Sequence, residues 1–468
     1  MSSSRLTIND LPNEMLVLIF SACHCSQRSP YITIPPNLNS SPWNITLVSS
    51  RWRAIALKMP SLWEHIFFDF NERQLPHPRP LFQFAQFSTR TMTLARSVLE
   101  RTWKNRPLYI SNDEELTDNQ GALTNLDSFI PAFVHFIGPI SSRIRRLDFQ
   151  CNSPGFVSLL SLKRGSFSNL EEVTFFIRAK GAIPLTHRSW VSAFENARQL
   201  SKVTFKSQGV LLNPAQLNIP WTRLTFLHFV YTDVQHTSLP NILRTCQNLT
   251  NLRLDLCNPL PAHYNPPMIT LPSLISFDYR VTQTSNQLFV SFDLPSIQYL
   301  TLRLMSFWSF TGFTVFASRS CCRLKGIHLV FTTPGTSSFY VGKVLPLLLN
   351  TLGAVKAPVV DCRILSSHIP KEVFAKLVNA LFPSLKLLTA GTGAPTTVAE
   401  FLDAVEAIHN RENSNGERKF RTATMIVREE MEETNRRKVE ELLAKGIDLR
   451  VVPFRENWND PPQWDEPL

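Results

Sequence analysis

The sequence predicts an α/β repeat fold in which a small helical module precedes a long array of short parallel strands. A short apolar pattern recurs from residue 144 onward, and two amphipathic segments with helical spacing lie before residue 60. The 468 residues include 33 Phe and only 15 Gly, which favours a large β-rich core without glycine-dependent ligand loops. With 43% hydrophobic and 18% charged residues, most of the chain is expected to fold.

The first amphipathic segment, residues 10–24, is a predicted helix. Asn9 or Asp10 can cap it, and Pro12 lies in the first turn, where its missing N–H costs nothing. The apolar residues that recur every fourth position and so share one face are Leu11, Met15, Ile19 and Cys23.

A segment rich in Pro, Ser and Asn follows, and residues 27–42 are predicted to be a loop. Helical spacing then returns from Val48 to Met59 and ends at Pro60. Trp63 and the strand-like sequence IFFDF come next. Two short helices with this many aliphatic side chains cannot bury them alone, so a partner is expected.

The motifs LPNEMLVLIF and LVSSRWRAIALKMPSLWEHI resemble the F-box of fungal F-box proteins. Three submotifs occur in the family's order: Leu-Pro-x-Glu, then Trp-Arg-x-Ile-Ala, then Pro-x-Leu-Trp. The resemblance covers residues 6–68, and a long polar insert at 24–42 separates the first two submotifs. The alternative is an ordinary small helical domain.

The resemblance implies a partner, because an F-box docks on the Skp adaptor of the Skp–cullin–F-box ubiquitin ligase. The residues that it assigns to the Skp interface or to its immediate core are Leu11, Pro12, Leu16, Ile19, Phe20, Val48, Trp52 and Trp63.

Residues 71–140 are predicted to connect the module to the array. A helical run through residues 84–101 ends in the strand-like PLYI, and a second helical run, LDSFIPAFVHFIGPI, follows an acidic loop. Both are expected to start the array. The domains predicted are therefore 1–70, 71–140, an array at 141–455 and an irregular tail at 456–468.

The recurring pattern is apolar-x-x-apolar-x-apolar, and the steps between its first eight occurrences run from 23 to 30 residues. Leucine-rich repeats have this consensus and a length of about 20–29 residues, so an irregular leucine-rich-repeat solenoid is predicted, with parallel strands on its concave face. A β-rich domain with coincidental spacing is the alternative. The nine blocks are IRRLDF (144–149), LEEVTF (170–175), LSKVTF (200–205), LTFLHF (224–229), LTNLRL (249–254), LISFDY (274–279), IQYLTL (297–302), LKGIHL (324–329) and LKLLTA (385–390).

Residues 341–410 have longer spacing and are predicted to form enlarged terminal repeats, with helices at 341–352, 372–382 and 397–410 and a strand at 357–365. The last repeat has a strand TATMIV, a charged helix EEMEETNRRKVEELLAK that Gly446 stops, and a strand DLRVV. Pairing of Glu432 with Arg436 and of Glu433 with Arg437 is expected on its solvated face.

The x positions of the strands face outward and are the predicted target-binding surface. Residues 151–410 contain 22 Lys and Arg against 12 Asp and Glu, so an acidic or phosphorylated target is the hypothesis, and solvated side chains without a target are the alternative. The candidate target-binding residues are Lys202, Lys206, Phe226, His228, Arg253, Arg280, Tyr299, Arg303 and His328.

Other chemistry is not indicated. The cysteines in strand-like runs, Cys151, Cys246, Cys257 and Cys362, are interpreted as buried thiols. The Cys23-His24-Cys25 run lacks a second ligand pair, and Gly391-Thr392-Gly393 lacks the rest of a phosphate loop. We predict no metal site, catalytic site or cofactor, no membrane span, and a location in the cytoplasm or nucleus.

The function predicted is a non-enzymatic substrate-recognition adaptor, with the N-terminal module bound to Skp and through it to cullin, and the array bound to an unknown target. Two alternatives remain. One is a repeat scaffold that binds Skp without cullin. The other, less favoured because the basic residues are dispersed, is a nucleic-acid-binding repeat protein.

Overall fold

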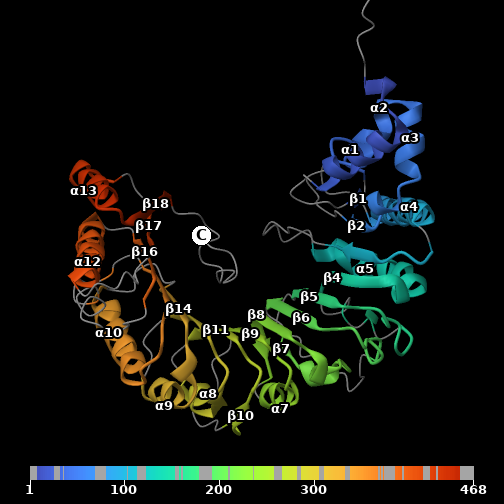
Figure 1. The fold of residues 1–468 in the computed structure, drawn as a ribbon. Coiled ribbons are helices and arrows are strands. Elements are labelled where there is room, and N and C mark those ends of the chain that lie inside the picture. The colour runs from blue at the N-terminus through green and yellow to red at the C-terminus, as the bar shows by residue number, and fades with distance from the viewer. Residues whose placement is uncertain are drawn as a thin grey trace, which may run out of the picture. The chain divides into compact units, whose positions relative to one another are not determined.

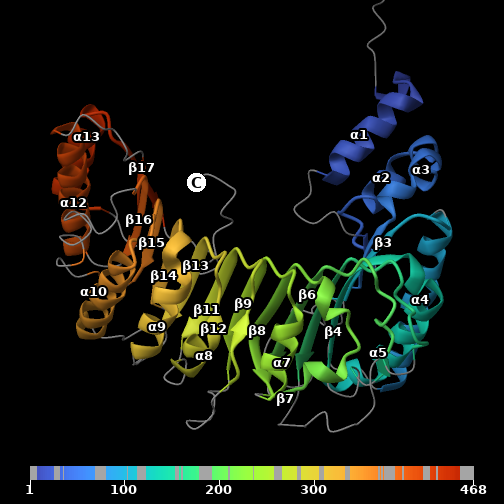
Figure 2. The ribbon, with the colours of Figure 1, turned by 60° about the horizontal axis from the view of Figure 1, so that its bottom comes forward.

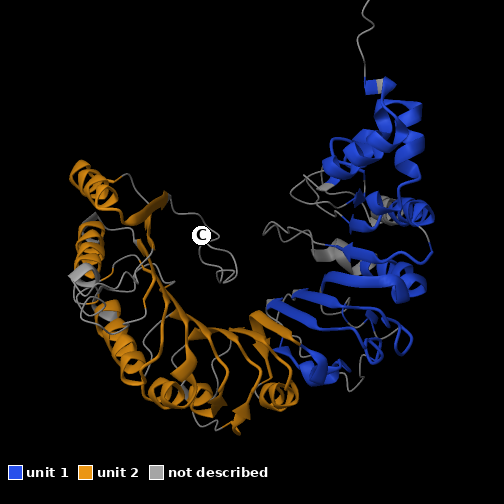
Figure 3. Ribbon diagram, viewed as in Figure 1, with its two compact units in different colours: residues 1–224 blue, residues 225–468 orange. Residues whose placement is uncertain are grey.

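The computed structural model describes residues 8–25, 32–34, 36–68, 81–102, 104–112, 123–152, 156, 158–159, 162–178, 192–208, 211–235, 237–257, 266–281, 286–304, 310–331, 338–366, 369, 373, 385–392, 395–414, 422–427 and 431–453. Its internal contacts divide the chain into two compact units, residues 1–224 and residues 225–468 (Figure 3). Each unit contains a parallel sheet with helices packed against it (Figure 1).

Unit 1 begins with short helices and continues into a parallel sheet with the strand order β1-β2-β3-β4-β5-β6. Its elements are η1 (Ile8–Asp10), α1 (Asn13–Cys25), β1 (Ile32–Ile34), α2 (Trp43–Val48), α3 (Ser50–Leu57), η2 (Pro60–Leu62), β2 (His65–Phe68), α4 (Leu81–Arg101), β3 (Leu108–Ser111), α5 (Leu123–Ile137), η4 (Gly138–Arg143), β4 (Ile144–Asn152), β5 (Glu172–Arg178), β6 (Lys202–Gln208), β7 (Leu211–Leu212), η6 (Pro214–Gln216) and η7 (Trp221–Arg223).

Unit 2 has the strand order β8-β9-β11-β13-β14-β15-β16-β17-β18, with its helices along one face of the sheet (Figure 2). Its elements are β8 (Phe226–Val234), α7 (Ser238–Thr245), β9 (Asn251–Leu256), β10 (Ile269–Thr270), β11 (Ser276–Val281), α8 (Asn286–Ser291), β12 (Phe292–Asp293), β13 (Tyr299–Leu304), α9 (Thr311–Ser320), η8 (Cys321–Arg323), β14 (Gly326–Phe331), α10 (Ser338–Ala354), β15 (Asp361–Leu365), β16 (Leu387–Thr392), α12 (Pro395–Ser414), β17 (Thr422–Val427), α13 (Glu433–Ala444) and β18 (Asp448–Pro453).

Each of the nine sequence blocks lies on a strand, and the strands pair in parallel. The register aligns the second apolar position of every block with that of the next strand, so one buried row runs through each sheet. A side-chain period of two then places the x positions on the other face. In unit 2 this row consists of Leu227, Leu252, Phe277, Leu300, Ile327, Cys362, Leu388, Ala423 and Leu449.

Phenylalanines fill the space between strands and helices. In unit 1, Phe175 stacks on Phe205 with ring centroids 5.3 Å apart, while the Phe194 ring meets Phe175 edge-on. In unit 2, Phe289 of α8 packs edge-to-face on Phe313 of α9 at 5.5 Å. The high phenylalanine content of the sequence therefore serves this core, because flat rings bridge the gap between irregular repeats.

The polar insert at 24–42 is only partly a loop, and here the sequence prediction was wrong. Residues 32–34 form β1, which pairs in parallel with β2 from Ile32↔Ile66 to Ile34↔Phe68. Both Ile32 and Ile34 are fully buried. The alternation in Ile-Thr-Ile is a strand signal, but three residues among prolines and asparagines are too short to stand out. The insert therefore extends the sheet of unit 1 into the N-terminal module.

The predicted helix from residue 48 to 59 is the shorter α3, and a separate helix that the sequence did not predict, α2, precedes it. Ser49 adopts an extended backbone between α2 and α3, and its hydroxyl accepts a hydrogen bond from the Trp52 backbone N–H at 3.1 Å. That bond is an N-cap, so the second helix starts there and the first ends at Val48. The terminal helix α13 is shorter than predicted. Its Glu433–Arg437 pair is present at 3.5 Å, and Gly446 follows it with a φ of +80°.

The cysteine prediction holds for three of the four positions. Cys151, Cys246 and Cys362 are buried, and burial raises the pKa of Cys246 to about 12. Cys257 is exposed instead, one residue after β9 ends at Leu256. Most of the predicted helix at 372–382, all of residues 71–80 and the tail from 454 onward lie outside the described residues.

Candidate functional site

The N-terminal module has its own aromatic core. Phe20 of α1 packs on Trp52 of α3 with ring centroids 4.9 Å apart, and Trp43 meets Trp63 edge-on at 5.4 Å. The indole N–H of Trp63 donates to the Ala56 backbone carbonyl at 2.9 Å, so this fully buried ring also satisfies its polar atom. The core holds the three helices and η2 as one body.

Large apolar side chains remain on the outside of this body. Met15 and Leu18 of α1 are 45% and 63% exposed, and Leu47 and Val48 at the end of α2 are 56% and 57% exposed. Residues 15 and 18 are neighbours on one helix face. Large exposed apolar side chains on the helices of one small module are candidates for contact with another molecule. We call these four residues the apolar face of the module.

Arg51 joins α3 to the segment at the start of α1. Its guanidinium donates to the Leu11 backbone carbonyl at 2.6 Å and to the Asn13 side chain at 2.8 Å. The beginning of α3 is therefore held against the beginning of α1. Because the Arg51 guanidinium donates to two oxygens, the position of α3 relative to the start of α1 is fixed before any partner binds.

The module is also joined to the sheet that follows. The Trp43 indole N–H donates to the Thr33 carbonyl of β1 at 3.2 Å, and Arg101 of α4 lies over the Trp63 ring at 4.8 Å. Together with the pairing of β1 and β2, these contacts fix the helices on the first strands of unit 1.

The eight residues that the sequence assigned to Skp binding divide into three groups. Leu16, Phe20, Trp52 and Trp63 are buried in the core, while Leu11 and Ile19 are half-buried. Only Pro12 and Val48 are exposed. Sequence reasoning missed Leu18 and Leu47, and it placed Met15 on a face without assigning it to the interface. Because α1 is apolar nearly all round, its sequence period gives two possible buried faces.

On the outward face of the unit 2 sheet, the candidate arginines are already paired. Asp278 accepts hydrogen bonds from Arg303 at 3.1 to 3.3 Å, and Arg253 Nε lies 3.3 Å from its Oδ2 atom. Arg280 Nη1 lies 2.8 Å from Asp255 Oδ1. The three arginines therefore share two carboxylates, which leaves the group one positive charge instead of the three that their sequence positions had suggested.

His328 lies beside this network and is also enclosed. It is 3% exposed, and its pKa is lowered to about 3 by burial, with Arg363 and Arg303 acting in the same direction. The remaining candidates are more accessible. Phe226, His228 and Tyr299 are half-buried, and Lys202 and Lys206 of β6 are exposed. A part in target binding stays a prediction for all nine.

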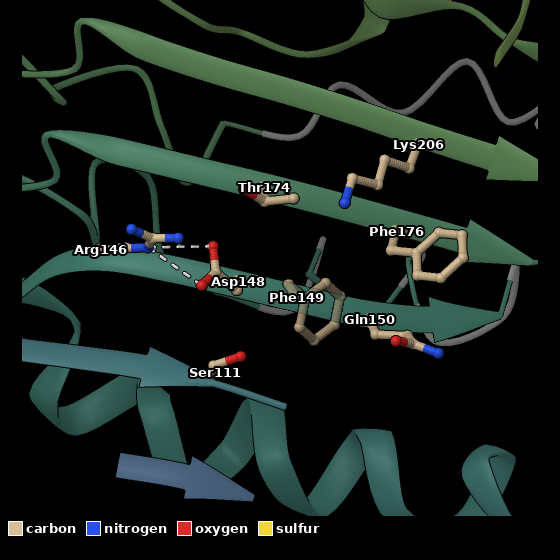
Figure 4. A pocket seen from close by; sticks show the side chains of 8 residues that line it. All are labelled: Ser111, Arg146, Asp148, Phe149, Gln150, Thr174, Phe176 and Lys206. Carbon is tan, nitrogen blue, oxygen red and sulfur yellow. Dashed lines mark hydrogen bonds and ion pairs between the residues drawn. The ribbon is translucent and has the colours of Figure 1, made fainter. Parts of the chain in front are cut away.

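The outward face of the unit 1 sheet contains a hollow with a volume of about 190 Å³ (Figure 4). Three residues of β4 that face outward line one side of it: Arg146, Asp148 and Gln150. Phe176 of β5 and Lys206 of β6 line the other side. Most of the lining is polar, and only Lys206 was among the sequence candidates.

With this geometry in place, the comparison with known families is informative. Residues 8–69 match the family model described as F-box-like. The match covers the helical module, including β1 and β2, and ends before α4. The chain therefore carries an F-box-like domain, the class of module that serves as a non-catalytic Skp-binding adaptor in ubiquitin ligase complexes. No curated protein matches the chain. None of the described helices is long and apolar enough to cross a membrane.

Proposed function

We propose that the protein is the substrate-recognition subunit of a Skp–cullin–F-box ubiquitin ligase. The F-box-like domain docks on Skp, and the parallel sheets that follow form a leucine-rich-repeat array like that of fungal F-box proteins and hold the target. The chain brings a target close to the ubiquitin-loaded partner, so its contribution is proximity and orientation. The setting is intracellular, in the cytoplasm or the nucleus.

The observation that carries this proposal is the apolar face of the module. Met15, Leu18, Leu47 and Val48 lie within the F-box-like match, and each is at least 45% exposed. Their burial against Skp removes apolar area from water, which is the main favourable term in association. The four core residues named from the sequence act indirectly, because they hold the helices that present this face.

A direct binding measurement tests the proposal. In the full chain, Leu18→Glu with Val48→Glu places two carboxylates in the interface and weakens binding to purified Skp by about 100-fold or more. A matched control, Val315→Glu with Leu347→Glu, changes one valine and one leucine of unit 2, which are 46% and 52% exposed. The control keeps wild-type affinity.

The outcome that contradicts Skp docking is equal affinity of the two double variants, with thermal midpoints that match the wild type. Addition of purified cullin then separates the ligase subunit from its rival. A ternary complex of chain, Skp and cullin supports the adaptor. A chain that binds Skp and excludes cullin is the scaffold instead.

A further inference from the structure

The hollow in the unit 1 sheet is lined by side chains of both charges. Arg146 is engaged, because its Nε lies 3.1 Å from Asp148 Oδ2 and its Nη1 lies 3.6 Å from Glu172 Oε1. A guanidinium between two carboxylates has little attraction left for a further anion. The positive charge of Arg146 is therefore not sufficient to make the hollow an anion-binding site.

Lys206 is in a different position. It is exposed, and within the described ranges it makes no hydrogen bond or ion pair. Figure 4 shows its amine directed toward β5, between Thr174 and Phe176. The ionisable side chains that line the hollow are Arg146, Lys206 and Asp148. With Glu172, the second partner of Arg146, this group is neutral overall, and Lys206 is the lining cation that no described carboxylate engages.

The uncharged lining is suited to a short polar side chain. Phe176 and the methylene stem of Lys206 form an apolar wall, and hydroxyl groups of Thr174 and Ser111 face the same space (Figure 4). Such a site can hold methylene groups against the ring while a charged end meets the ammonium.

We propose that this hollow binds the carboxylate of one aspartate or glutamate of the target, with the Lys206 ammonium as its counter-ion and Phe176 against its methylene groups. The inference rests on the proposed function, since it assigns the target a place on the array. It also moves the predicted acidic contact from the arginines of unit 2, which share two carboxylates, to Lys206.

A carboxylate fits better than a phosphate for electrostatic reasons. A phosphorylated residue carries close to two negative charges at pH 7. Only one unpaired cation lines the described hollow, and Asp148 stands in the same lining. The second charge of a phosphate would therefore face a carboxylate without compensation.

Peptide selection on the purified full chain tests the inference. A phage-displayed library of random nonapeptides is selected at low salt, where surface charge pairs are least screened. Selection on the wild type enriches peptides with a fixed Asp or Glu. One enriched peptide is then synthesised with Glu, Gln or phosphoserine at that position, and its affinity is measured by fluorescence anisotropy.

The Glu peptide binds the wild type about tenfold more tightly than the Gln peptide, which is the size expected for one charge-assisted contact. Lys206→Gln removes this preference. The control Lys163→Gln keeps it, because Lys163 is an exposed lysine of unit 1 that lies outside the hollow and outside the predicted target-binding residues.

Three results overturn the inference: no acidic enrichment on the wild type, an unchanged preference in Lys206→Gln, or tighter binding of the phosphoserine peptide than of the Glu peptide. Skp affinity of the same preparations is measured in parallel. If the wild type binds Skp normally and any of these results is obtained, only the proposed role of the hollow is refuted. If Skp does not bind through the apolar face, the proposed function itself is refuted.

Discussion

Asp278 is the residue whose removal tests the charge network of unit 2 most directly. It is 5% exposed, and burial raises its pKa although Arg303 and Arg253 act in the opposite direction. The side chains of these arginines are only 6% and 11% exposed. In Asp278→Asn the volume is preserved, so no cavity forms, but two guanidinium groups remain nearly buried without their shared carboxylate.

The expected loss follows from this burial. Removal of one partner from a buried ion pair costs about 3–5 kcal/mol, because the remaining charge is desolvated and uncompensated. Asn still accepts one hydrogen bond, so we expect the lower end, about 3 kcal/mol. The ion pair of Glu433 and Arg437, whose side chains are 68% and 73% exposed, is the solvent-exposed comparison. Glu433→Gln is expected to cost about 0.3–0.5 kcal/mol.

Urea denaturation of the full chain is the assay, because urea keeps the ionic strength constant. Native-state hydrogen exchange in β13 reports the same loss locally, since Thr301 of β13 pairs with residue 278. This second measurement matters because long repeat arrays need not unfold in two states. If Asp278→Asn costs no more than Glu433→Gln, water solvates the arginines and the reasoning fails.

Two further predictions concern single residues. The pKa of His328 in the folded protein is about 3, below its ordinary value of 6.5. Between pH 6.5 and pH 3 the imidazole therefore binds a proton in the unfolded chain but stays neutral in the folded protein. Stability is therefore lost on acidification, by about 2 kcal/mol from this group between pH 6.5 and pH 5. In His328→Gln the difference between urea midpoints at pH 7 and pH 5 shrinks accordingly, and an unchanged difference argues against a neutral buried histidine. For Gly446, a Cβ would meet nothing within 4 Å, so Gly446→Ala tests its φ of +80° alone. The variant is expected to lose about 1 kcal/mol by urea unfolding, Gly446→Asn less, and equal stability of all three would show that the turn relaxes.

Much of the sheet architecture was readable from the chain because its cause is local and repeated. The apolar pattern of a block fixes which side chains face inward, and each block needs a neighbour to bury them. Leu252, Phe277 and Leu300 therefore align in one buried row at the positions that their motifs predict. The F-box-like module was readable for a different reason, since three short motifs in order carry its recognition.

The surfaces were not readable to the same extent. A basic residue at an outward position looks the same in sequence whether it has no ion-pair partner among the described residues, like Lys206, or is paired, like Arg303. The pairing depends on the aspartate of the neighbouring strand, 25 residues earlier in the chain. Only the register between strands brings the two together, and no local pattern encodes it.

By itself, the sequence determined the order of a helical module and parallel strands, the inward rows and the resemblance of the N-terminus to an F-box. Tertiary structure alone decided which side of α1 is covered. Leu16 and Phe20 became core and Met15 and Leu18 became surface, although both pairs have helical spacing. A helix that is apolar nearly all round can turn either side inward, and its neighbours in the fold make the choice.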